Sequence, residues 1–270
     1  MSRIFDALRR SGGEPSPRTF SRAPGEDASW RDLVESIERK PANSEKMGKV
    51  RCVFDPESHI VAHAGKQDPA AEKFRVLAQR LVQLRQRRPL SRLLVASSSP
   101  NDGKTVVAVN LAATLARTSA RVALIDADLR QPGVGRALGI PAMPGLSDYL
   151  EGRIELAAAF KIAEPLRVYY VPAGQATGDP VDLLQGSPMD ELMIYATETF
   201  DWVIFDSPPL HPFADAQHLA SIADGVLLVA RAEKTRRRAL KQSLASLDGA
   251  HLLGVVFNAC GEARSDRDGY

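Results

Sequence analysis

A lysine, a threonine and three aspartates in this chain have the types and spacing needed to handle phosphate and magnesium. Gly103-Lys104-Thr105 follows a small polar stretch, Ser97 to Asp102, and opens a segment with apolar residues at helical spacing. In a phosphate-binding loop, backbone N–H groups surround the phosphates, the lysine reaches the outer phosphates and the threonine hydroxyl ligates Mg²⁺. The triplet therefore predicts a triphosphate site. Ser98 replaces the first glycine of the full pattern, so a surface lysine at a helix start is the alternative.

The aspartates follow two other short apolar runs. Asp126 and Asp128 come directly after Val122 to Ile125, and Asp206 comes after Trp202 to Phe205, ahead of two prolines. Carboxylates two residues apart can share a metal through water, or one can hold Mg²⁺ while the other takes a proton from an attacking hydroxyl. A single aspartate at such a place is most simply a turn residue. Three of them downstream of Gly-Lys-Thr predict a site for a magnesium-bound nucleotide.

Apolar runs alternate with segments of helical periodicity along most of the chain. The runs span 93–96, 122–125, 168–171, 202–205, 225–230 and 252–257, with an expected edge strand at 50–54, and the expected helices span 69–87, 103–118, 145–151, 188–199, 213–222 and 236–247. This alternation predicts an α/β fold, a mostly parallel sheet with helices on both faces. Ligands of such sheets bind beyond the carboxyl ends of the strands, where the lysine and the aspartates fall.

Composition sets the remaining bounds. The chain has 270 residues, 44% of them hydrophobic, and a net charge of +2, which argues for no particular partner, so we expect no nucleic-acid partner. Its two cysteines lie far apart and indicate neither a zinc site nor a disulfide framework. We expect a mostly disordered tether at 1–48 with a short amphipathic start at 1–10, a P-loop domain at 49–260 and a flexible tail at 261–270. The absence of a long apolar run favours a cytoplasmic protein.

Several separated motifs resemble those of one known family. SSSPNDGKT, ALIDADLRQP and WVIFDSPPL are similar to the Walker A, Walker A′ and Walker B motifs of bacterial protein-tyrosine kinases, the autokinases of capsule and exopolysaccharide synthesis. EKFRVLAQRL, VPAG, PVDLLQ and LLGVVFN resemble the framework of the same family, so the resemblance covers roughly residues 68 to 260. It implies a P-loop fold of the MinD/ParA-like kind, ATP and Mg²⁺ as cofactors, and autophosphorylation on tyrosine.

The resemblance also implies a role for each matching residue. Lys104 would hold the β- and γ-phosphates, and Asp126 would be the base for the tyrosine hydroxyl. Asp128, with Asp206 and Thr105, would organise the metal, and Lys104, Asp126 and Asp128 would form the catalytic set. The expected nucleotide-binding residues are Ser99, Pro100, Asn101, Asp102, Gly103, Lys104, Thr105, Val106 and Asn258. Asn258 either contacts a base edge or simply ends a turn.

The chain departs from the family pattern at two places. The helix before the loop usually carries Glu, Arg and Arg at three-residue steps, a motif tied to ring-like self-association, but here Glu72 and Arg75 are followed by Ala78. Whether a homo-oligomer forms through that surface is therefore open. After Cys260 the only tyrosine is Tyr270, where family members carry a cluster. Tyr270 is then the candidate phosphoacceptor, unless the substrate lies on another protein or the kinase activity is degenerate.

Two alternatives remain at this point. A positioning or partition ATPase of the same broad fold typically carries a lysine five residues before the loop lysine, where this chain has Ser99. A catalytically weak nucleotide-binding regulator of polysaccharide assembly would explain the missing tyrosines. The resemblance implies a separate membrane partner, a polysaccharide chain-length or co-polymerase protein, as activator. It also implies peripheral recruitment to the inner face of the cell membrane. A basic group between 231 and 241 is expected to be mostly solvated surface, with nucleotide, an acidic neighbour or anionic lipid as other contacts.

Overall fold

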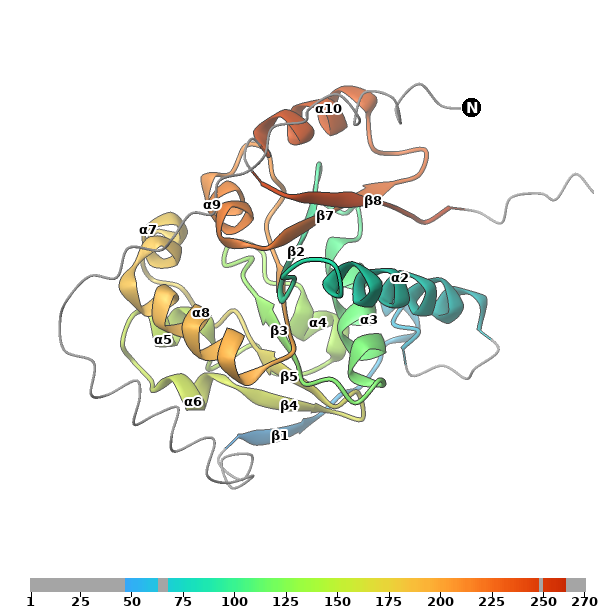
Figure 1. Ribbon diagram of the computed structural model, residues 1–270. Helices are drawn as coiled ribbons and strands as arrows, with labels where there is room; N and C mark the ends of the chain where they lie inside the picture. The colour runs from blue at the N-terminus through green and yellow to red at the C-terminus, as the bar shows by residue number, and fades with distance from the viewer. Residues whose placement is uncertain (1–46, 63–67, 248–249, 261–270) are drawn as a thin grey trace, which may run out of the picture.

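A computed structural model describes residues 47–62, 68–247 and 250–260 and shows one eight-stranded sheet (Figure 1). The strands lie in the order β1-β4-β5-β3-β6-β2-β7-β8. Their bounds are β1 Gly48–Arg51, β2 Arg92–Ser97, β3 Val122–Asp126, β4 Lys161–Glu164, β5 Val168–Val171, β6 Trp202–Asp206, β7 Gly225–Arg231 and β8 Leu252–Asn258.

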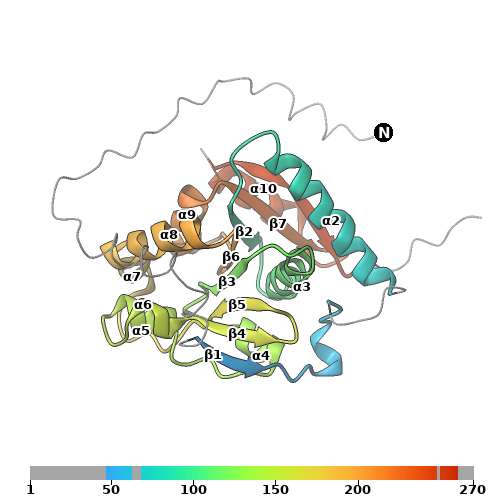
Figure 2. The ribbon, with the colours of Figure 1, turned by 60° about the horizontal axis from the view of Figure 1, so that its bottom comes forward.

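Helices cover both faces of the sheet, with α2 and α3 on one side and α7, α8 and α9 on the other (Figure 2). The helices are α2 Pro69–Arg85, α3 Lys104–Ala116, α4 Val134–Leu138, α5 Leu146–Leu150, α6 Leu156–Ala159, α7 Pro180–Gln185, α8 Ser187–Thr199, α9 Ala214–Ile222 and α10 Arg237–Ser246, with a short 3-10 turn at Pro56–Ser58. Two hydrophobic clusters, one on each face, fill the space between sheet and helices. The expected α/β fold with helices on both faces is confirmed.

The sheet is parallel over its central strands and reverses toward one edge. β4 pairs antiparallel with β5, and β1 pairs parallel with β4, so these two strands run against the others. Only three residues, Pro165 to Arg167, separate β4 from β5. A connection that short can join antiparallel strands only, because a parallel crossover needs a dozen or more residues.

Most expected elements agree with the structure to within a few residues. The expected edge strand exists, but it runs from Gly48 to Arg51 rather than from 50 to 54. Four short elements, β4, α4, α6 and α7, have no counterpart among the expected elements, because each has at most six residues and an apolar pattern that short repeats too few times to be recognised. Of the expected tether at 1–48, residues 1–46 lie outside the described residues, as does the expected tail at 261–270. Met47 is buried in the core and Gly48 begins β1, so the domain starts slightly before the expected boundary.

The interior strands explain why the sheet is a rigid support. All five residues of β3 and of β6 are buried, as are five of the six in β2. Strands buried on both faces read as continuous apolar runs, which is why these three were visible in the sequence. β3 and β6 end at the same level of the sheet, since Asp126 of β3 lies directly opposite Asp206 of β6.

Asp224 anchors the beginning of β2 from the turn before β7. Its carboxylate accepts hydrogen bonds from the backbone N–H groups of Ser91 and Arg92 and from the Arg92 guanidinium. Burial raises the pKa of this carboxyl, but the hydrogen bonds from Arg92 and Ser91 outweigh burial and lower it overall. We expect Asp224→Ala to destabilise the fold by about 2–4 kcal/mol, since it removes a largely buried charged partner. Urea unfolding at neutral pH measures this change.

The same interaction sets a pH dependence. Because the folded-state pKa of Asp224 lies below its ordinary value of 3.8, its stabilisation is present above that value and is lost as the pH falls through the lowered one. The difference in free energy of unfolding between wild type and Asp224→Ala should therefore become smaller in acid. An advantage that stays constant down to strongly acidic pH would contradict this role.

Candidate nucleotide and phosphoryl-transfer site

The carboxyl ends of β2, β3 and β6 bring the loop lysine and the three aspartates to one place. β6 pairs with β2 on one side and with β3 on the other, so the loops that follow these strands are neighbours. Asp126, Asp128 and Asp206 are at most 2% exposed. Buried carboxylates need a partner, and the residues nearby supply it.

Lys104 and Thr105, the first two residues of α3, each contact one of these acids. The Lys104 ammonium lies 3.0 Å from Asp128 Oδ2, and the lysine side chain is 14% exposed. The Thr105 hydroxyl donates a hydrogen bond of 2.6 Å to Asp206 Oδ2. The first turn of α3 is therefore tied to both aspartate-bearing strands, which places its free N–H groups beside the acids.

Asp126 is held by backbone donors. Its Oδ2 accepts from the N–H groups of Gly133 and Val134, at the start of α4, at 3.1 and 3.0 Å. These bonds leave Oδ1 without a partner among the described residues, although the atom is buried. The side chain is thus oriented from one side and keeps its second oxygen available to a ligand.

The free oxygens suit a metal that is shared with phosphates and water. Oδ1 of Asp206 is likewise buried and unpartnered among the described residues. Within those residues, no group of three or more His, Cys, Asp or Glu side chains could hold a metal ion. Mg²⁺ commonly uses one or two carboxylates and completes its shell with phosphate oxygens and waters, so the free oxygen of Asp206 suits that ion. Both oxygens of Asp128 are occupied, by Lys104 and by the N–H of Gln131, and a metal held by Thr105, Asp128 and Asp206 stays a prediction.

Burial, with repulsion between neighbouring carboxylates, raises the pKa of Asp126 and of Asp206. Burial, followed by the nearby Asp206, raises the pKa of Asp126 well above its ordinary value. Burial also raises the pKa of Asp206 to about 6, although Lys104 and the Thr105 hydroxyl act to lower it. Burial alone would lower the pKa of Lys104, but the three carboxylates outweigh it and the pKa is raised. A carboxyl with a raised pKa at such a place suits proton transfer.

Gly103 must be glycine because of its backbone and its neighbour. Its φ is +95°, and a Cβ atom there would lie 1.9 Å from Nδ2 of Asn258. Asn258, the last residue of β8, donates a hydrogen bond from its side chain to the carbonyl of Asp102 at 3.0 Å. Asn258 therefore shapes the phosphate loop directly, and a contact of this residue with a base stays a prediction.

Asp102 organises the loop from inside. Its carboxylate accepts from the N–H of Ser99 at 3.0 Å and from the Thr235 hydroxyl at 2.8 Å, and the residue is 1% exposed. The Arg231 guanidinium also donates to the carbonyl of Asn101. A contact of Asp102 with nucleotide stays a prediction, and the sequence pattern assigns Thr235 no role. Sequence reasoning missed their pairing because 133 residues separate them.

A second cluster missed from the sequence joins the loops after β3 and β6. Arg130 Nε donates to Asp215 Oδ2 at 2.8 Å, and the Asp215 side chain is 1% exposed. The guanidinium also lies 5.1 Å from the centre of the Phe213 ring. The only sequence signal was the arginine two residues after Asp128. The cluster joins the loop after β3, which carries Asp128, to the beginning of α9.

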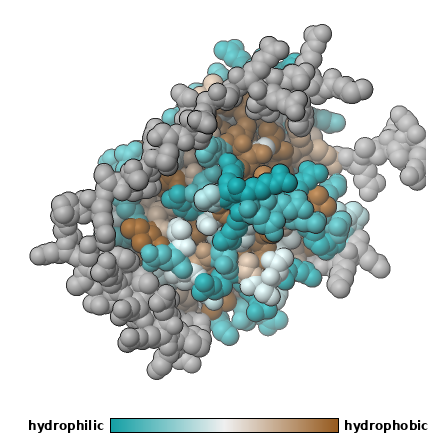
Figure 3. All heavy atoms as spheres, viewed as in Figure 1, coloured by the Kyte–Doolittle hydropathy of each residue, from teal (hydrophilic) through white to brown (hydrophobic). Residues whose placement is uncertain are grey.

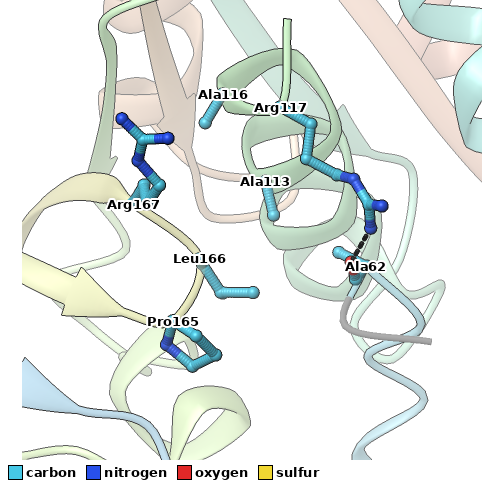
Figure 4. A pocket seen from close by; sticks show the side chains of 7 residues that line it. All are labelled: Ala62, Ala113, Ala116, Arg117, Pro165, Leu166 and Arg167. Carbon is cyan, nitrogen blue, oxygen red and sulfur yellow. Dashed lines mark hydrogen bonds between the residues drawn. The ribbon is translucent and has the colours of Figure 1, made fainter. Parts of the chain in front are cut away.

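One cavity lies away from these acids (Figure 4). It measures about 390 Å³ and lies between the C-terminal end of α3 and the turn from β4 to β5. Its lining consists of Ala62, Ala113, Ala116, Arg117, Pro165, Leu166 and Arg167. Since α3 begins at Lys104 and ends at Ala116, the cavity is at the opposite end of that helix from the loop and is no part of the candidate site.

Two further features bear on the sequence expectations. Ala78 is 4% exposed and belongs to the hydrophobic cluster shared by α2 and α3, so this position of the three-residue motif supports the core. Glu72 and Arg75 pair with each other within α2.

Across the described residues, no helix is long and apolar enough to cross a membrane.

Comparisons with known proteins show a nucleotide-binding domain and its family. The model of the CobQ/CobB/MinD/ParA nucleotide binding domain matches residues 93–268. The tyrosine-protein kinase YwqD of Bacillus subtilis is 30% identical over 217 residues, which cover 79% of this chain and 91% of YwqD. The tyrosine-protein kinase wzc of Salmonella typhimurium is 32% identical over 205 residues, covering 75% of this chain and 28% of wzc. This chain thus spans less than a third of wzc.

Solved structures agree with the sequence relatives. The kinase domain of the Escherichia coli tyrosine kinase ETK is 28% identical, with a TM-score of 0.70, and the match covers 78% of this chain and 84% of that domain. Cobyrinic acid a,c-diamide synthase from Mycobacterium smegmatis, solved with an ATP analog and magnesium, shares the fold at 21% identity and a TM-score of 0.52, over 62% of this chain and 75% of that one. The chain belongs to the bacterial tyrosine-protein kinases and is built on the CobQ/CobB/MinD/ParA nucleotide-binding domain.

Proposed function

We propose that this protein transfers the γ-phosphoryl group of Mg-ATP to protein tyrosine, in the assembly or export of a capsule or exopolysaccharide. The observation that carries the proposal is the convergence of Lys104, Asp126 and Asp206 at one end of three adjacent strands. Phosphoryl transfer depends mainly on positioning and charge neutralisation, which such a cluster supplies. The polysaccharide role is proposed because relatives include the succinoglycan biosynthesis transport protein ExoP of Rhizobium meliloti.

Each residue has a defined role in this proposal. Lys104 would neutralise the β- and γ-phosphates, and the N–H groups at the start of α3 would bind their oxygens. Thr105, Asp128 and Asp206 would hold Mg²⁺, which supplies charge neutralisation at the phosphates. Asp126 would accept the proton of the attacking tyrosine hydroxyl on its unpartnered Oδ1. Release of Asp128 from Lys104 would accompany nucleotide binding, since the phosphates replace it as the lysine's partner.

The proposal extends to a membrane partner and to the place of the protein in the cell. A membrane polysaccharide chain-length or co-polymerase protein would act as activator and would recruit this protein to the inner face of the cell membrane. Residues 1–10, which are amphipathic in sequence, are the proposed contact. Self-association stays open, because Ala78 lies in the core where the family motif has an arginine.

The choice of acceptor tyrosine narrows to Tyr270 or to another protein. Tyr149, Tyr170 and Tyr195 are 8%, 0% and 5% exposed, and burial raises the pKa of each of their hydroxyls. Tyr169 is half-buried, and its ring packs against Phe200 at a centroid distance of 5.0 Å. Burial of three of these side chains and the ring contact of Tyr169 disfavour all four as acceptors while the fold is intact.

Incubating the purified full chain with Mg-ATP and mapping phosphotyrosine by mass spectrometry tests this function. We expect phosphate on Tyr270, and Tyr270→Phe should abolish self-phosphorylation while leaving nucleotide binding unchanged, because the residue lies outside the described domain. ATP hydrolysis with no phosphotyrosine on the chain or on an added tyrosine polymer would favour the partition-type ATPase. Persistent phosphate on a buried tyrosine of the Phe variant would refute the acceptor assignment.

A further inference from the structure

The last strand of the sheet has an open side. β8 pairs with β7 and with no other strand among the described residues. An edge strand presents unpaired backbone groups, and proteins usually protect it with charges, prolines or short length. β8 has seven residues, LLGVVFN, without a charge or a proline. The strand at the other edge, β1, has four residues and carries Lys49 and Arg51.

The direction of the backbone identifies which groups face outward. The carbonyl of Asn258 accepts a hydrogen bond from the N–H of Ala232, so the backbone of Asn258 turns toward β7. Successive residues of a strand turn to alternate sides. The N–H and C=O groups of Val255 and Phe257 therefore turn toward the open edge, where the Phe257 carbonyl accepts a weak bond from the Cys260 thiol.

The side chains of these residues form an uncovered apolar strip. Val255 and Phe257, two residues apart, lie on the same face of β8 and are 36% and 63% exposed. Their partners on β7 are Leu228 and Ala230, and Leu228 shares a hydrophobic cluster with Leu240 of α10. The strip therefore lies on the face that α10 partly covers. Hydrophobic surface is visible in this region in the space-filling view (Figure 3).

Six cations, the basic segment, lie at the carboxyl end of this strand. The basic segment comprises Arg231, Lys234, Arg236, Arg237, Arg238 and Lys241, all of them exposed. Within the described parts of the chain none of the six forms an ion pair, and Glu233 is the only acid between them. Arg231 pairs with Asn258 across the two strands, so the basic segment begins where β8 ends.

We propose that β8 is a docking strand that takes up an extended, acidic segment of a partner polypeptide as an additional strand. Backbone hydrogen bonds to Val255 and Phe257 would supply affinity, and apolar residues of the segment would cover the same two side chains. Acidic residues of the segment would lie against the basic segment and set its register. The added strand would end beside Asn258, which contacts the phosphate loop through the carbonyl of Asp102.

Other occupants fit these observations less well. A second copy of β8 has no acid to place against the basic segment. A lipid headgroup surface attracts cations but provides no row of donors and acceptors for the outward N–H and C=O groups of an edge strand. A polypeptide strand with acidic residues satisfies the backbone, the apolar strip and the charges together.

Val255→Pro tests the backbone part of the proposal. The Val255 N–H faces away from β7, so proline removes the outward donor without removing a bond of the existing sheet, and proline is tolerated at such edge positions. The probes are two fluorescein-labelled peptides of alternating valine and threonine, with three aspartates at either the amino or the carboxyl end. Their fluorescence anisotropy is measured with the full chain. We expect Val255→Pro to weaken binding of the better probe by at least about tenfold, and Val255→Ala to change it by less than about threefold.

A charge-matched pair of variants tests the basic segment and does not depend on the proline variant folding. Arg236, Arg237 and Arg238 are changed to Glu in one variant, and Lys73, Arg80 and Arg87 of the α2 region in the other. We expect the affinity for the better peptide probe to fall by at least about tenfold in the variant of the basic segment and by less than about threefold in the α2 variant. Equal losses in both would overturn the proposal as general charge attraction.

Three further outcomes would overturn it. The first is a folded Val255→Pro variant that binds the probes as tightly as wild type. The second is dimerisation of the chain that Val255→Pro abolishes, which would assign the edge to a second copy. The third is binding to membranes alone: neither peptide binds, the wild-type chain sediments with phosphatidylglycerol vesicles, and the variant with Arg236, Arg237 and Arg238 changed to Glu does not. That result would assign the basic segment to a membrane.

Discussion

Replacing Asp126 with asparagine is expected to lower phosphotyrosine formation by about 10²–10⁴-fold while Mg-ATP still binds, because the change removes the proton acceptor and little else. The amide oxygen can still accept from the N–H groups of Gly133 and Val134, so the side chain keeps its orientation. Burial and Asp206 raise the pKa of Asp126, which suits it to receive a proton. Single-turnover phosphorylation, with nucleotide binding measured separately by calorimetry, distinguishes the two effects.

Asp215→Asn is a matched control for this substitution. It makes the same carboxyl-to-amide change at another buried aspartate, one that pairs with Arg130 rather than facing the site. We expect a much smaller loss of phosphotransfer from this control. A wild-type rate in Asp126→Asn would remove Asp126 from the role of base, whereas an equal loss in both variants would mean that the rate reports loop arrangement.

Replacing Lys104 with methionine is expected to have two separable effects. Phosphotransfer should fall by at least about 10²-fold, because the variant loses the charge that neutralises the outer phosphates. The nucleotide-free fold should also lose about 3–5 kcal/mol at neutral pH, because Asp128 loses its 3.0 Å partner and three buried carboxylates lose their counter-ion. Urea unfolding without nucleotide and magnesium measures the second effect.

The pH dependence of that second effect follows from the carboxyl pKa values. Burial raises the pKa of Asp206 to about 6 in the folded state, above its ordinary value of 3.8. A group with a raised folded-state pKa stabilises the fold most at low pH, and this contribution is lost as the pH rises through the raised value. Removing Lys104 raises the pKa of Asp206 further, so the variant continues to lose folding stability at pH values where the wild type no longer does. The deficit of Lys104→Met should thus be larger at about pH 8 than at about pH 6. A deficit independent of pH would contradict the counter-ion role of Lys104.

The chemistry-bearing residues were visible in the sequence because local patterns encode them. Gly103-Lys104-Thr105 marks the start of a helix after a buried strand, and Asp126 and Asp206 follow apolar runs that can only be interior strands. Strands buried on both faces leave a continuous apolar signal, and their carboxyl ends are the usual place of ligands in such a sheet. The sites were therefore predictable even though the partners of each side chain were not.

By itself, the sequence determined the class of fold and the family, and it singled out the lysine and the acids, since each of these depends on motifs that are local in the chain. Only the tertiary structure decided that Asp102 meets Thr235, that Arg130 meets Asp215, and that Ala78 belongs to the core. It also decided that β8 is an edge strand with Val255 and Phe257 uncovered, and that β4 runs against its neighbour. The physical reason is that strand order and loop packing depend on contacts between distant segments, which no local period of apolar residues records.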